Sequence, residues 1–160
     1  MLNENNTNKL NDVLNVLETN FQRLNFAYLR NEKFLPFTKS ILQDLDPEQI
    51  SFVDQYIFRF AKIQDIMGDK LFGMILELVE EYNDSLAFID KLNKLEKLEV
   101  IKDKEEWIYL RKLRNEVSHE YPLLDDEAVA SLNNLFRSKD KLMDIYHSCL
   151  NYLHKRRIIE

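Results

Sequence analysis

Glycine and proline are scarce in this sequence. Only 2 glycines and 3 prolines occur in 160 residues, whereas average usage would give roughly 11 and 8. A protein with many β-strands needs these residues at its turns. The scarcity of both residues excludes a β-sandwich or barrel, and we expect an all-α protein with no sheet.

Cysteines and long apolar runs are also lacking. Cys149 is the one cysteine, so no internal disulfide and no cysteine pair for a zinc knuckle can form. This usage is typical of a reducing compartment. No apolar run reaches 18 residues, and the opening MLNENNTNKL lacks the basic and then apolar pattern of a signal peptide. We expect a cytoplasmic protein that enters no membrane.

Basic charge is in deficit, with 22 basic against 28 acidic residues and a net charge of −6. This balance excludes a protein that coats nucleic acid by bulk charge. One segment departs from it, because residues 91–114 carry eight basic and five acidic side chains. The segment fits the basic rim of a small cleft, and it fits an ordinary solvated helix face equally well.

Apolar residues recur at spacings of three and four along the first half of the chain, as in amphipathic helices. They predict a helix over residues 8–30, after a loose lead-in at residues 1–8. An open connector over residues 31–45 follows. Asp46, Pro47 and Glu48 then form a helix start signal of cap, fixed φ and favourable charge. The long helix that follows reaches residue 78, with Gly68 as a candidate kink.

The second half of the chain continues the same pattern in shorter helices. Asp84 and Ser85 offer a cap for a helix over residues 86–98, and a break near Asp103 precedes the next helix. That helix ends before Pro122, because proline cannot lie inside a helix. Asp125 caps one final helix. Four or five helices with short links predict an up-and-down bundle that forms one domain over residues 1–160.

The helix that ends before Pro122 carries an unusual density of polar groups. Residues 112–122 read KLRNEVSHEYP, and such side chains can hydrogen-bond a phosphate or move a proton. On a helix Asn115 and His119 share a face, whereas Arg114 and His119 diverge by about 140°. Two copies related by a two-fold axis could bring both types of group into one cleft. The same residues are also common as helix-dipole partners and caps.

The HEPN superfamily has a signature of arginine, four residues, histidine, any residue and tyrosine. The spacing of Arg114, His119 and Tyr121 resembles this signature. The pattern is specifically similar to the HepT toxins of prokaryotic HepT/MNT toxin–antitoxin pairs. It lies late in an all-α chain, before the last long helix, where that family carries it. Residues 56–68, YIFRFAKIQDIMG, also look like a HepT-like subfamily. The resemblance implies a HEPN-like fold over the whole chain.

The resemblance also implies an activity, that of a metal-independent endoribonuclease toxin that needs no cofactor. The active site would be a cleft between the subunits of a homodimer, and the substrate single-stranded RNA, with transfer RNA as the family's candidate. The implied catalytic residues are Arg114 and His119, assisted by Asn115. Imidazole suits proton transfer and guanidinium suits phosphate charge. Arg111, Lys112 and Ser118 would bind RNA.

Tyr121 receives a separate role from the resemblance. In HepT/MNT pairs the antitoxin is a minimal nucleotidyltransferase that attaches AMP to this tyrosine. A phosphodiester beside Arg114 and His119 would occupy the phosphate site and add negative charge where RNA enters. Tyr121 also fits a half-buried aromatic that packs the helix end, and both descriptions can hold.

Two other classes of function stay open. The chain could be a non-catalytic subunit that presents nucleotide or substrate to a nucleotidyltransferase, or a helical adaptor with an incidental motif. We predict no metal site, because His147 and His154 lie about 10 Å apart along a helix and cannot share one ion. Arg59 and Asp65 would line the cleft if they face inward, although such residues more often form a solvated face.

Overall fold

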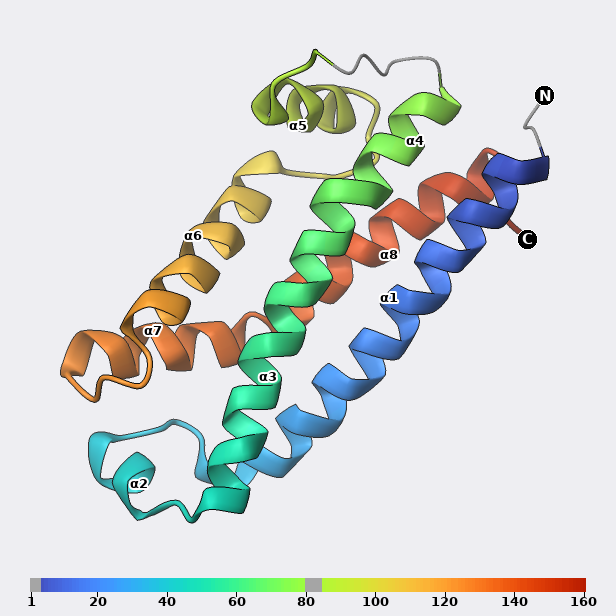
Figure 1. The fold of residues 1–160 in the computed structure, drawn as a ribbon. Helices are drawn as coiled ribbons and strands as arrows, with labels where there is room; N and C mark the ends of the chain where they lie inside the picture. The colour runs from blue at the N-terminus through green and yellow to red at the C-terminus, as the bar shows by residue number, and fades with distance from the viewer. Residues whose placement is uncertain (1–3, 80–84) are drawn as a thin grey trace.

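The computed structural model describes residues 4–79 and 85–160, and within these ranges every regular element is helical. Six α-helices contain ten or more residues, and two shorter ones accompany them (Figure 1). The expected all-α class is confirmed for the described ranges. The expected number of four or five helices was too low. The last predicted helix is divided into two, one short helix forms in the predicted connector, and another continues the second long helix.

Helix α1, Glu4–Asn31, begins earlier than its apolar pattern predicts. Residues 4–8, which we expected to be a loose lead-in, form its first turns, and residues 1–3 lie outside the described ranges. The negative charge of Glu4 in the first turn interacts favourably with the positive end of the helix dipole and stabilises this end of the helix. Leu10 and Leu17 anchor this helix in the core. The polar residues of the first turns can therefore extend the helix without being buried themselves.

The connector after α1 is more ordered than its sequence predicts. It contains a 3₁₀ turn, Glu32–Phe34, and the short helix α2, Lys39–Asp44, whose N-cap Thr38 accepts from the amide of Ile41. The buried Phe37 donates its amide to Asn133 Oδ1 at 2.7 Å and accepts from Asn133 Nδ2 at 2.9 Å. This two-point contact ties the connector to a segment almost a hundred residues later.

Helix α3, Pro47–Ile66, starts as its sequence predicts. Asp46 accepts from the amide of Gln49, and the Gln49 side chain accepts in return from the amide of Asp46. No break separates α3 from α4, Phe72–Leu78, because a π-helical stretch, Met67–Leu71, joins them. Gly68 lies in that stretch, where a Cβ atom would come within 3.3 Å of Trp107 Cζ2. The glycine therefore serves close packing.

Helix α5, Phe88–Lys97, begins later than predicted. Its N-cap is Ala87, which makes no side-chain cap hydrogen bond, so the prediction of Ser85 as the cap was wrong; Asp84 lies outside the described ranges. The apolar Phe88 and Leu92 position this helix through burial against its neighbours.

The three helices that follow are α6, Lys104–Glu120, α7, Asp126–Arg137, and α8, Lys139–Lys155. The predicted cap Asp125 is confirmed, since it accepts from the amide of Ala128. Asp103, near which the sequence predicted only a break, caps α6 by accepting from the amide of Glu105. The prediction of one final helix was wrong. Ser138 interrupts it, with its amide bonded to the carbonyl of Leu135.

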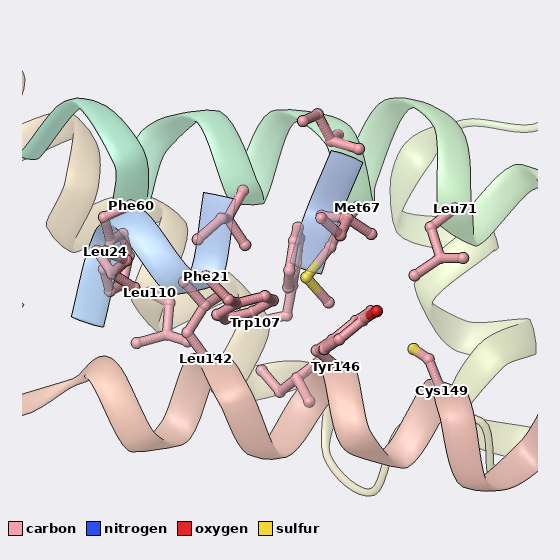
Figure 2. Close-up of a cluster of buried hydrophobic side chains, with 14 of the residues drawn as sticks. Phe21, Leu24, Phe60, Met67, Leu71, Trp107, Leu110, Leu142, Tyr146 and Cys149 are labelled. Atoms are coloured by element: carbon pink, nitrogen blue, oxygen red, sulfur yellow. The ribbon is translucent and has the colours of Figure 1, made fainter. Parts of the chain in front are cut away.

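Helix α3 is the centre of the bundle, with α1 packed along it and α6 antiparallel to it (Figure 1). Side chains of α1, α3, α6 and α8 meet in one apolar core, where Trp107 and Tyr146 are among the largest buried groups (Figure 2). Tyr56 of α3 stacks on Phe136 of α7 with ring centroids 3.8 Å apart. No helix in the described ranges is long and apolar enough to span a membrane.

The hydroxyl of Tyr56 is buried and donates to the carbonyl of Leu135 at 2.9 Å. We expect Tyr56→Phe to lower the free energy of unfolding by about 1 kcal/mol, because the ring packing is kept and one buried hydrogen bond is lost. Urea denaturation measures this. Tyr109→Phe is the control, since Tyr109 is exposed, and its effect should stay below about 0.5 kcal/mol. Equal midpoints for Tyr56→Phe and wild type would contradict the prediction.

Candidate functional site

The polar motif occupies the last turns of α6 and the residue after it. Tyr121 is the C-cap, and its amide donates to the carbonyl of Val117. Val117 and Leu113 are buried and fix the rotation of the helix end. Helix α6 contacts both α3 and α5, and its polar side chains are divided between these two neighbours.

Arg114 lies on the side that faces α3. Its Nη2 donates to Asp65 Oδ1 at 2.9 Å, and the side chains of Arg114 and Asp65 are 19% and 46% exposed. Among the described residues this ion pair is the contact that the Arg114 guanidinium makes. Ser118 bonds locally instead, since its Oγ donates to the Arg114 carbonyl at 2.9 Å.

Tyr121, seven residues after Arg114, also faces α3, where it meets Asp54. Burial raises the pKa of its phenol well above the ordinary value, and the charge of Asp54 and a hydrogen bond to that carboxylate raise this pKa further. The phenol is therefore protonated at neutral pH. Any reaction at its oxygen requires a base to accept the proton, and the Asp54 carboxylate already accepts the hydrogen bond.

Asn115 and His119 lie on the other side of α6 and line a groove of about 700 Å³ against α5. Arg111 and Lys112 line the same groove, and the remaining described lining comes from Phe88, Ile89, Leu92, Trp107, Ile108, Glu116 and Glu120. The Arg111 guanidinium lies 5.1 Å from the centre of the Phe88 ring. The groove thus has an apolar, aromatic end and a polar end at His119.

The structure therefore brings four of the seven predicted site residues into one groove and directs Arg114 and Tyr121 to the opposite side. The hydroxyl of Ser118 is directed to its own helix. Sequence reasoning assigned no role to Asp54, although its spacing of eleven from Asp65 places both on one face of α3. It also gave no signal for Phe88, since the meeting of α5 with α6 depends on tertiary packing.

In the described ranges no three histidine, cysteine, aspartate or glutamate side chains gather in a group that could hold a metal ion. His147 and His154 are both exposed on α8.

Comparison with known proteins adds no relative to this description. No protein-family model matches the chain, and no curated protein and no solved structure matches it either.

The Arg114–Asp65 pair is partly exposed, so its value for stability should be small. We expect Asp65→Asn to change the free energy of unfolding by less than about 1 kcal/mol. Asp144→Asn, an exposed acidic position on α8, is the matched control in the same urea titration. A loss of several kcal/mol in Asp65→Asn alone would mean that the pair holds α6 on α3.

Proposed function

We propose that the chain is an endoribonuclease of the HEPN type that acts as a homodimer, and that it is the HepT-like toxin of a toxin–antitoxin pair. The observation that carries the proposal is the division of the motif between two sides of α6. Arg114, anchored by Asp65, faces α3, and His119 faces the groove on the α5 side. The two groups can meet in a cleft shared by two protomers, because one protomer then supplies the Arg114 cation and the other supplies His119 for proton transfer.

The chemistry follows from the two groups. The 2′-oxygen of the ribose attacks phosphorus and the bond to the 5′-oxygen breaks. His119 transfers a proton from the attacking hydroxyl or to the leaving oxygen. The guanidinium of Arg114 donates two parallel hydrogen bonds to the phosphorane, whose negative charge it stabilises. Asn115 lies on the same face as His119 and orients the phosphate. Single-stranded RNA is the substrate, because in-line attack requires a strand that can bend.

We expect Arg114→Ala and His119→Ala each to abolish RNA cleavage and growth inhibition while the protein stays folded. Mixing the two inactive variants then tests the shared cleft. A mixed dimer holds one cleft with both substitutions and one cleft with neither, so random exchange should restore about a quarter of the wild-type cleavage rate. The measurement is cleavage of a labelled single-stranded RNA by the purified proteins.

Circular dichroism confirms that each variant is folded, and either variant alone is the matched control for the mixture. No recovery on mixing, with subunit exchange demonstrated, would place both residues in one protomer and refute the shared cleft. An active, folded His119→Ala would refute the mechanism. Lack of cleavage by the wild type would favour the non-catalytic nucleotide-binding subunit.

Tyr121 is the proposed site of silencing by a minimal nucleotidyltransferase antitoxin that transfers AMP to its phenol. What supports this is the Asp54 carboxylate beside the phenol, since a carboxylate in that position accepts the proton as the oxygen attacks the α-phosphate of ATP and pyrophosphate leaves. We expect Tyr121→Phe to remain a nuclease and to escape modification. Mass spectrometry after co-expression with the antitoxin measures the AMP adduct. An adduct on the Tyr121→Phe protein would place the modification elsewhere.

A further inference from the structure

The groove between α5 and α6 extends well beyond His119. Its α6 lining runs from Trp107 to Glu120, which is about 20 Å along a helix axis. Proton transfer at His119 uses only one end of such a length. The other end lies where an RNA strand would continue if its phosphate were held at His119 and Asn115.

The far end of the groove has the chemistry of a nucleobase site. Phe88 presents an aromatic ring, and the Arg111 guanidinium lies 5.1 Å from the ring centre. Unstacked bases of single-stranded RNA stack on aromatic rings and on guanidinium planes. Ile89 and Ile108 beside them are 47% and 36% exposed, an apolar rim that gains from being covered. Lys112 at the edge forms an ion pair with Glu116 at 3.8 Å.

The polar end of the groove selects against a purely apolar occupant. Glu120 lines it, and its Oε2 is buried with no hydrogen-bond partner in the described ranges. A buried acceptor of this kind requires a donor. Ribose supplies hydroxyl donors, whereas an acyl chain supplies none. An aromatic ring with a guanidinium over it, and an acceptor that needs a donor, together fit a nucleotide.

We propose that the α5–α6 groove binds the nucleotide next to the cleaved phosphate, with its base stacked on Phe88 and Arg111. This inference rests on the proposed function, because it takes RNA as the occupant. It assigns to Phe88 and Arg111 the binding of a base, a role separate from the proton transfer at His119.

Trp107 reports on this site, because it lines the groove and is the one tryptophan of the chain. The probes are adenosine 5′-monophosphate and ribose 5-phosphate, which differ in the base and cannot be cleaved. We expect the adenosine nucleotide to change the Trp107 emission and to bind about 5- to 150-fold more tightly than ribose phosphate, the range of one stacked base.

Arg111→Lys keeps the charge and removes the planar group, so it should reduce this ratio toward one. Arg137→Lys is the matched control, since Arg137 is exposed on α7 outside the groove, and it should leave the ratio unchanged. Equal binding of both probes to the wild type would overturn the proposal.

The nuclease assay separates the two proposals. Cleavage that depends on His119 together with equal binding of both probes would leave the endoribonuclease standing and remove the base site. Preferential binding of adenosine 5′-monophosphate by a protein without nuclease activity would keep the base site and remove the endoribonuclease.

Discussion

The close approach of Trp107 to Gly68 is the contact on which the arrangement of the candidate site depends. Any side chain at residue 68 would begin with a Cβ only 3.3 Å from the indole, so the absence of one lets α6 lie directly against the π-helical stretch after α3. Phe72 packs on the same indole with ring centroids 4.7 Å apart. Since large buried aromatic groups contribute most to core packing, this contact sets the distance and the rotation of α6.

The two sides of the motif follow from that rotation. With Trp107, Leu110 and Leu113 buried, the helical repeat turns Arg114 toward Asp65 and Asn115 toward α5. The proposed division of labour between two protomers is thus a consequence of how α6 packs. Trp107 itself also lines the groove, so core packing and the proposed base site share one residue.

The sequence predicted those features of the fold that local chemistry controls. The capping signals at Asp46 and Asp125 and the stop before Pro122 were correct, because a cap or a proline acts within one helical turn. The sequence did not predict the features of the fold that depend on contacts between residues far apart in the chain. The connector is ordered by the Phe37–Asn133 contact, and neither the break at Ser138 nor the alanine cap of α5 has a strong local signal.

For the candidate site the same distinction holds. The sequence by itself determined an all-α chain and a polar helix end in which Arg114 and His119 diverge, because composition and the helical repeat are properties of the chain alone. Only the tertiary structure decided that Asp65 anchors Arg114, that Asp54 meets Tyr121 and that Phe88 completes a groove beside His119. Those contacts join residues from separate helices, and packing of the whole core determines which helix faces meet.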